Sequence, residues 1–339
     1  MGNEVEQQSF ARPSPNIVVM GGGTGSFNLL TKLKYYTPNI TALVSMFDNG
    51  GSSGGLRDEY GVLPPGDARQ CLVALSDAPM VRDLFDFRFG EGSINGHSAG
   101  NLIITAYERL TGDPAKAIKL AGQLLKITGR VLPITTDSAN LIIQDGDREI
   151  VGEHQIEGES FNAGQRPGMF LRPTAAANPE AVDALREADI IVLPPGSLYE
   201  SIISNFLVDG IPQAVAERQG HVVQVVNLVT KPGHTDNWRV DDYVTEVERF
   251  AGKGVVHTAL YNTQLPTPEM LGQYARDGEY PVQYDAGQVA DRTYDPVGMD
   301  LVHIHTEEPN ANDALAVERT LIRHDADTVS RFLMKLYFS

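Results

Sequence analysis

Five apolar runs rich in valine, isoleucine and leucine constrain the fold of this chain more than any other feature. The runs are nearly continuous, which is typical of strands that are buried on both faces of a parallel sheet. Most are followed by a loop containing glycine or proline and then by a helical pattern of apolar residues. This alternation predicts an α/β fold with a largely parallel sheet. The runs span residues 16–20, 40–47, 189–194, 221–229 and 254–262.

The chain is predicted to form one α/β domain, residues 16–339, with a smaller β-rich insertion. The insertion is expected at residues 131–172, where strand-like segments flank an Asp-Gly turn signal and no convincing helix intervenes. Residues 1–15 are polar, lack an apolar stretch and are expected to form a disordered tail. Residues 285–298 are also polar and are predicted to be a surface loop.

The charge balance excludes several classes of partner. The chain has 44 acidic and 27 basic residues, a net charge of −17, so its field repels nucleic acid and anionic membranes. A small anionic ligand is still compatible, because backbone N–H groups and a few arginines act at short range. No apolar run is long enough to cross a bilayer, which predicts no membrane insertion and a cytoplasmic location. The single cysteine, Cys71, is expected in the core.

The first glycine-rich loop follows the first apolar run, in the segment VVMGGGTGSFNLL. A β-branched run that ends in glycines and opens into a helix is typical of a phosphate-binding turn. It is not a Walker A loop, because no Lys-Ser/Thr pair follows the glycines. It is also an imperfect dinucleotide motif, because Asn28 stands where a third glycine is expected. The pattern indicates an anion or nucleotide site, with a tight turn that binds nothing as the alternative.

The second apolar run ends in Asp48-Asn49 and continues into GGSSGGLR. A carboxylate in this place can bind a ribose hydroxyl, or it can hold a divalent metal beside a pyrophosphate. The glycines can present N–H groups to an anion, with Arg57 as a fork-shaped donor. Asp67, after a Pro-Pro-Gly turn, is either a helix N-cap or a member of the same site.

Polar residues recur in three further loops. Ligands in open parallel sheets bind outside the carboxyl ends of the strands, so we expect such loops to surround one site. The histidine among them is weak support, because a lone loop histidine is more often structural. The loops contribute His97, Ser98, Asn101, Gly196, Ser197, Asn227 and Thr230.

Six motifs in this order resemble the gluconeogenesis factor family (YvcK-like), within the superfamily of 2-phospho-L-lactate transferase (CofD). The resemblance runs from about residue 16 to the C-terminus. It implies a doubly wound, Rossmann-like, mostly parallel sheet with a nucleotide or nucleotide-linked ligand at the strand ends. The motifs are GGGTG, DNGGSSGGLR, LPPGDAR, GHSAGNL, LPPGSLYESI and IRHD.

The resemblance implies one of two functions. The YvcK-like branch resembles a binder of UDP-sugars, notably UDP-N-acetylglucosamine, that supports cell shape and cell-wall synthesis during gluconeogenic growth. The CofD branch implies a Mg²⁺-dependent transferase that moves a phospholactyl group from a guanylated donor to a deazaflavin alcohol. The SSG, LPPGD and GHS-GN motifs favour the first branch. The sequence leaves open whether the protein forms a homo-oligomer.

The resemblance also implies roles for residues. Tyr274 and Arg323 would lie near the C-terminal side of the pocket, where the Arg323 guanidinium can pair with two diphosphate oxygens. If the protein is a transferase, the resemblance implies that Asp48 and Asp67 are catalytic and ligate Mg²⁺ as the cofactor. Phosphate contacts are implied for Gly22, Gly23, Thr24 and Gly25, with uridine and sugar contacts from residues 196–197 and 227–230. The wider ligand-binding set adds Asn49, Ser52, Ser53, Arg57, His97, Ser98 and Asn101.

The chain departs from the family pattern at two places. Asp48-Asn49 stands where the family has Asp-Asp, and Gln70 stands where it has asparagine. Losing a carboxylate weakens a two-carboxylate metal site, because Mg²⁺ needs charged oxygen ligands to offset its dehydration. The departure argues against phosphotransfer more than against binding.

Overall fold

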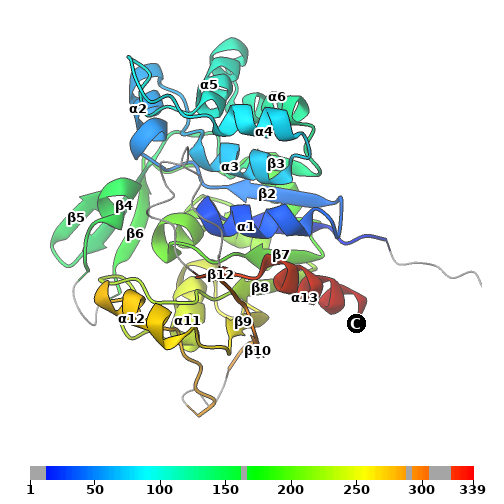
Figure 1. The fold of residues 1–339 in the computed structure, drawn as a ribbon, viewed down its shortest axis with the longest axis vertical. Helices are drawn as coiled ribbons and strands as arrows, with labels where there is room; N and C mark the ends of the chain where they lie inside the picture. The colour runs from blue at the N-terminus through cyan, green and yellow to red at the C-terminus, as the bar shows by residue number, and fades with distance from the viewer. Residues whose placement is uncertain (1–12, 162–165, 288–291, 305–321) are drawn as a thin grey trace, which may run out of the picture.

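A seven-stranded sheet forms the centre of the computed structural model, which describes residues 13–161, 166–287, 292–304 and 322–339. The strand order is β10-β9-β8-β7-β1-β2-β3, and every neighbouring pair is parallel (Figure 1). This confirms the predicted doubly wound α/β fold, and each of the five apolar runs contains a strand. The strands are β1 (Ile17–Met20), β2 (Ile40–Val44), β3 (Arg130–Pro133), β7 (Ile190–Leu193), β8 (His221–Val225), β9 (Thr258–Asn262) and β10 (Asp295–Met299).

Helices cover both faces of the sheet, which is why the strands read as unbroken apolar runs. In β1, Val18 and Met20 join one buried cluster while Ile17 and Val19 join the other. The second cluster contains side chains of α1 (Gly23–Leu33), α3 (Gly66–Leu75), α6 (Pro114–Leu125) and α13 (Ala326–Phe338). The first contains side chains of α8 (Pro179–Arg186), α10 (Ile211–Ala216) and α11 (Val240–Ala251). Cys71 is buried on α3, as predicted.

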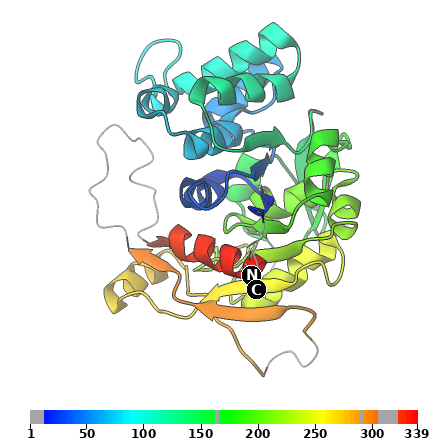
Figure 2. The same ribbon diagram turned by 90° about the vertical axis from the view of Figure 1, so that its right-hand side faces the viewer.

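The remaining elements lie around this core (Figure 2). α13, the red C-terminal helix in Figure 1, packs against the blue α1. No helix in the described part of the chain has the length and apolar character of a membrane span. The other helices are α2 (Gly51–Tyr60), α4 (Pro79–Asp86), α5 (Ala99–Thr111), α7 (Glu153–Glu157), the π-helix η1 (Leu198–Ile203), α9 (Ser204–Phe206) and α12 (Pro268–Arg276). Two short strands, β11 (Val302–Ile304) and β12 (Ile322–His324), pair antiparallel.

The β-rich segment forms a three-stranded antiparallel sheet in the order β5-β4-β6. Its strands are β4 (Asn140–Asp145), β5 (Arg148–Val151) and β6 (Gly168–Arg172), and the predicted Asp-Gly turn joins the first two. The predicted bounds, 131–172, also include β3, which pairs with β2 in the central sheet, and the short helix α7. The antiparallel part therefore begins at Asn140, and how the chain divides into domains stays a prediction.

Two further predictions need correction. The expected loop at residues 285–298 contains most of β10, the outermost strand, whereas residues 288–291 lie outside the described residues. An edge strand has one neighbour and stays partly exposed, so it does not need an apolar run. Residues 1–12 of the expected tail also lie outside the described residues. The Pro15 carbonyl accepts a hydrogen bond from Thr37, so residue 15 belongs to the folded domain and not to a disordered tail.

The turn from β1 into α1 passes very close to two neighbouring segments. A Cβ atom on Gly25 would lie 1.7 Å from the Pro195 carbonyl oxygen, in the loop after β7. A Cβ atom on Gly22 would lie 1.6 Å from Oδ2 of Asp67. At Gly25 the neighbouring atom belongs to backbone, so only glycine fits there. At Gly22 a side chain would have to displace the Asp67 carboxylate, which accepts a hydrogen bond from the Gly23 N–H. These glycines let the start of α1 lie against the loop that follows β7 and against the first turn of α3.

We expect Gly25→Ala to lower the free energy of unfolding by about 2 kcal/mol or more, because the added methyl group forces backbone apart. The matched control is Gly272→Ala in α12, where a Cβ atom would meet no atom within 4 Å. That change should raise stability by up to about 1 kcal/mol through helix propensity. Urea denaturation followed by circular dichroism measures both, and equal stability of Gly25→Ala and the wild type would contradict the close approach.

Candidate functional site

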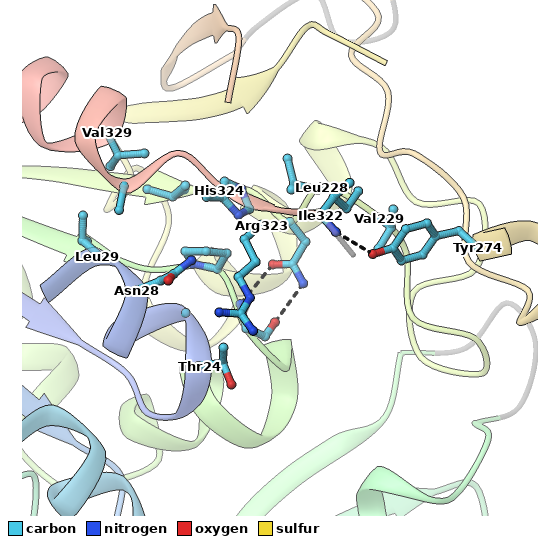
Figure 3. A pocket seen from close by; sticks show the side chains of 16 residues that line it. Thr24, Asn28, Leu29, Leu228, Val229, Tyr274, Ile322, Arg323, His324 and Val329 are labelled. Atoms are coloured by element: carbon cyan, nitrogen blue, oxygen red, sulfur yellow. Dashed lines mark hydrogen bonds between the residues drawn. The ribbon is translucent and has the colours of Figure 1, made fainter. Parts of the chain in front are cut away.

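A pocket of about 190 Å³ opens at the start of α1 (Figure 3). It lies between α1, the loops that follow β7 and β8, and the chain around β12, so the carboxyl ends of two central strands border it. The apolar part of its wall comes from Leu29, Val225, Leu228, Val229, Ile322 and Val329. The polar side chains are Thr24, Asn28, Asn227, Tyr274, Arg323 and His324.

The first loop contributes to this pocket only in part. Thr24 and Gly25 line it, whereas Gly22 and Gly23 lie against Asp67. The Gly23 N–H donates to Oδ1 of Asp67 at 3.0 Å, so one orphan donor of the helix start is already used by a carboxylate. The start of a helix carries partial positive charge and favours an anion. Asp67 thus occupies one side of this helix start, and the pocket lies on the other.

Tyr274 and Arg323, far apart in the sequence, both line the pocket. The Ile322 N–H donates to the Tyr274 hydroxyl at 3.1 Å, as the dashed line in Figure 3 shows. Asp325 caps α13 by accepting from the N–H groups of Asp327 and Thr328, which ends β12 directly after its two polar residues. Figure 3 shows the Arg323 side chain directed toward Thr24 at the start of α1.

His324 is a pocket residue that is not among those predicted from sequence. Its Nε2 donates to the Val226 carbonyl at 2.9 Å, and burial lowers the pKa of its imidazole to about 4. The ring is therefore neutral at pH 7. The sequence feature that points to His324 as a pocket residue is its place in the IRHD motif, next to Arg323.

Asn227 lines the pocket but uses its amide to hold a loop. Its Oδ1 accepts from the Gly196 N–H at 3.3 Å, and its Nδ2 donates to the Gly196 carbonyl at 2.9 Å. Thr230 is buried and exchanges hydrogen bonds with the backbone of Tyr280. Ser197 starts the π-helix, where its carbonyl accepts from the Ser201 N–H. Gly196 and Asn227 therefore border the pocket, while Thr230 and Ser197 lie outside its wall.

Three carboxylates form a second polar region beside the start of α1. Burial and the neighbouring charge of Asp48 raise the pKa of Asp67 to about 7, although the Gly23 N–H and Arg69 oppose the shift. Burial, then the charges of Asp67 and Asp48, raise the pKa of Glu153 well above its ordinary range. Glu153 comes from α7 and is not among the predicted site residues. No described residue gives Oε2 of Glu153 a hydrogen bond.

These carboxylates suit a hard cation only in part. Their oxygen atoms are the ligands that Mg²⁺ prefers. Among the described residues, however, no group of three or more His, Cys, Asp or Glu side chains is arranged to hold a metal ion. A Mg²⁺ ion held by Asp48 and Asp67 would therefore take its other ligands from water and from a bound phosphate.

Asn49, the departure from the family pattern, connects the second loop to α7. Its Oδ1 accepts from the His154 N–H, and its Nδ2 donates to Oε1 of Gln155, both at 2.9 Å. Aspartate has no N–H to give, so it would lose the second bond. Because His154 follows Glu153 directly, Asn49 helps to place the Glu153 carboxylate near Asp48 and Asp67.

The other predicted polar residues lie near this second region and hold its elements together. Ser52 Oγ lies 2.9 Å from Nδ1 of His97 and accepts from Nδ2 of Asn101 at 3.1 Å. Ser98 caps α5 by accepting from the Asn101 N–H. These contacts join α2 to α5 and to the loop before it.

Arg57 and Ser53 are also engaged within the protein. Arg57 donates to the Ala139 carbonyl and to Oδ1 of Asn140, which anchors the start of β4. Ser53 is buried, and a Cβ atom on Gly66 would lie 2.4 Å from its Oγ. The predicted fork of Arg57 thus binds the protein itself, through the Ala139 carbonyl and the Asn140 side chain. None of the predicted residues of α2 or α5 lines the described pocket.

Several known proteins are similar to this chain. The family model described as 2-phospho-L-lactate transferase CofD matches residues 17–302. The gluconeogenesis factor of Bacillus subtilis is 36% identical over 327 residues, which cover 95% of this chain and 98% of the relative. That of Listeria innocua is 35% identical, with 95% of each chain covered. An X-ray crystal structure of a Bacillus halodurans protein superimposes with a TM-score of 0.85 at 33% identity, covering 95% and 99%.

We expect Asp67→Asn to raise the free energy of unfolding at pH 8 by about 1–3 kcal/mol in buffer free of divalent cations. The pKa of Asp67 is about 7 in the folded protein and about 3.8 in the unfolded chain, so folding favours the protonated form. The wild type therefore loses stability as the pH rises from about 4 through 7, and asparagine removes that loss. At pH 4 the two proteins should differ little.

Urea denaturation at both pH values measures this effect. The control is Asp58→Asn, an exposed position on α2, which should change stability equally at pH 4 and pH 8. A gain for Asp67→Asn that does not depend on pH would show that the charge of Asp67 is not the cause.

Proposed function

Because this chain belongs to the gluconeogenesis factor family, within the CofD superfamily, we propose that it binds a nucleotide-sugar without converting it. The proposed ligand is a UDP-sugar, UDP-N-acetylglucosamine by the family resemblance. The proposed role is regulation of cell shape and cell-wall synthesis during gluconeogenic growth. The observation that supports binding most directly is the pocket in which Arg323 points toward the start of α1.

The charge distribution of the pocket suits a diphosphate. The N-terminus of α1 carries partial positive charge, and Thr24 and Gly25 of its first turn line the wall. Arg323 supplies a guanidinium from the opposite side, and its planar fork matches two phosphate oxygens. The acidic side chains of the second region lie on the other side of the helix start, where Asp67 binds the Gly23 N–H. A diphosphate would thus face positive groups only on the pocket side.

The rest of the wall suits a base or a sugar. Leucine, valine and isoleucine side chains provide apolar contact, which is the common lining of small-molecule sites. Tyr274 adds an aromatic side chain whose hydroxyl is held by the backbone of β12. Ligand sites of this type combine apolar walls with a few polar groups that orient the ligand.

We expect Arg323→Ala to weaken binding of UDP-N-acetylglucosamine about 10- to 100-fold, because a charge-assisted bond to phosphate is lost. The matched control is Arg331→Ala, an exposed arginine on α13 that pairs with Asp327. The affinity of the Arg331→Ala variant for UDP-N-acetylglucosamine should match that of the wild type. Isothermal titration calorimetry measures the three dissociation constants, and mass spectrometry afterwards should return the intact ligand.

A wild-type protein that binds neither UDP nor the UDP-sugar would contradict the proposed function. If Arg331→Ala weakened binding as much as Arg323→Ala, a general loss of positive charge would explain the effect instead. The ratio of the dissociation constants of the two variants therefore tests whether the ligand binds in this pocket.

The second candidate function is a Mg²⁺-dependent transferase acting on a nucleoside-diphosphate-linked donor. The observation that favours it is the group of carboxylates, Asp48, Asp67 and Glu153, beside the first turn of α1. Mg²⁺ bound there would offset charge on a phosphate leaving group. Asp48 and Asp67 would orient the donor through it, and Asn49 would keep Glu153 close.

Under the proposed function we expect Asp48→Asn to leave the dissociation constant of the UDP-sugar within about threefold, with no product from any donor. The control is Asp58→Asn, which lies on the exposed side of α2. Incubation of both variants and the wild type with UDP-N-acetylglucosamine or a guanylated donor, with Mg²⁺, is followed by mass spectrometry. Mg²⁺-dependent product from the wild type and Asp58→Asn, absent with Asp48→Asn, would establish the transferase instead.

A further inference from the structure

The two ring nitrogens of His324 have different and well-defined roles. Nε2 lies 2.9 Å from the Val226 carbonyl oxygen. A carbonyl oxygen can only accept, so Nε2 carries the hydrogen. Burial keeps the ring neutral at pH 7, and a neutral imidazole has one donor and one acceptor. Nδ1 is therefore a hydrogen-bond acceptor.

This acceptor is available within the pocket wall. His324 lines the pocket, and its Nδ1 makes no hydrogen bond to any residue that the structure describes. His324 is half-buried rather than fully enclosed, so a ligand atom in the pocket can approach its ring. The neighbouring amide of Asn227 is already engaged by Gly196 in both directions. A ligand atom in this part of the pocket would meet an acceptor at His324.

The orientation of the ring is set before a ligand arrives. The Val226 N–H donates to Leu260 at 2.9 Å, so the carbonyl that holds Nε2 belongs to backbone tied to β9. On the other side, the Asp325 N–H donates to the Leu301 carbonyl at 2.8 Å, and Asp325 caps α13. A ring held in this way does not need to turn when a ligand binds, and such preorganisation favours discrimination between ligands.

The side chains around His324 suit a flat ring. Leu29, Val225 and Val329 line the same pocket, and Figure 3 shows Leu29 and Val329 on the side of His324. Apolar contact of this kind matches the face of a nucleobase better than a sugar ring bearing several hydroxyl groups. The group that would reach Nδ1 is then a donor on the edge of the base.

We propose that His324 is a specificity-determining residue, whose Nδ1 accepts a hydrogen bond from the imide N–H of a uracil base. This inference rests on the proposed function and adds the residue that selects the base. Uracil carries a hydrogen on N3, whereas N3 of cytosine is an acceptor. Cytosine would therefore place two acceptors opposite each other and leave both unpaired, which is costly in a buried site.

The test compares UDP with CDP, which differ at the base alone. We expect the wild type to bind UDP about 10- to 100-fold more tightly than CDP. His324→Phe should bring the ratio of the CDP and UDP dissociation constants close to one, mainly by weakening the binding of UDP. His324→Gln keeps one donor and one acceptor and should retain part of the preference. Calorimetry gives the dissociation constants, and near-ultraviolet circular dichroism checks that both variants are folded.

Three results would overturn the proposal. The first is a wild type that binds UDP and CDP equally, and the second is a His324→Phe variant that weakens both nucleotides by the same factor, as a packing role would. The third is ¹⁵N NMR of the free protein at pH 7 showing the hydrogen of His324 on Nδ1 rather than Nε2. A wild type that binds neither nucleotide would instead refute the proposed function, and this proposal with it.

Discussion

The direct packing of the β1–α1 turn against its neighbours is the constraint on which the rest of the site depends. The backbone at Gly25 lies against the Pro195 carbonyl, and that at Gly22 lies against the Asp67 carboxylate. The Pro195 backbone leaves no room for a side chain at Gly25, and the helix start sits between the loop after β7 and the start of α3. Its two sides then differ in charge. One side meets a carboxylate, and the other faces a pocket that contains Arg323.

Most polar residues at this edge of the sheet act by holding loops rather than by facing the pocket. Asn227 binds the backbone of Gly196 through both atoms of its amide. Asn49 binds α7 through the backbone N–H of His154 and the side chain of Gln155. A loop that follows a strand leaves backbone groups without partners, and short polar side chains satisfy them locally. A binding edge therefore needs two kinds of polar residue, those that build the loops and those that meet the ligand.

The prediction from sequence is strong for the sheet and weaker for the side chains. All five apolar runs contain strands because burial on both faces requires them to be continuously apolar. The edge strand β10 is partly exposed and begins with Asp295-Pro296, so it resembles a loop. Thr24, Tyr274 and Arg323 do reach the pocket. Arg57 does not, because its guanidinium binds Ala139 and Asn140 of the insertion.

The sequence by itself determined the class of fold and the order of its glycine loops, because apolar periodicity and turn residues are local properties of the chain. The resemblance of its motifs to those of a known family indicated the family. The tertiary structure alone decided which of these loops meet. Glu153 lies near Asp48 and Asp67 because tertiary packing brings α7 to them, and Asn49 contributes to this by binding α7 across more than a hundred residues of chain. The tautomer of His324 likewise depends on a carbonyl of Val226, 98 residues away. Such contacts arise from long-range packing, and no local pattern encodes the direction in which a side chain finally points.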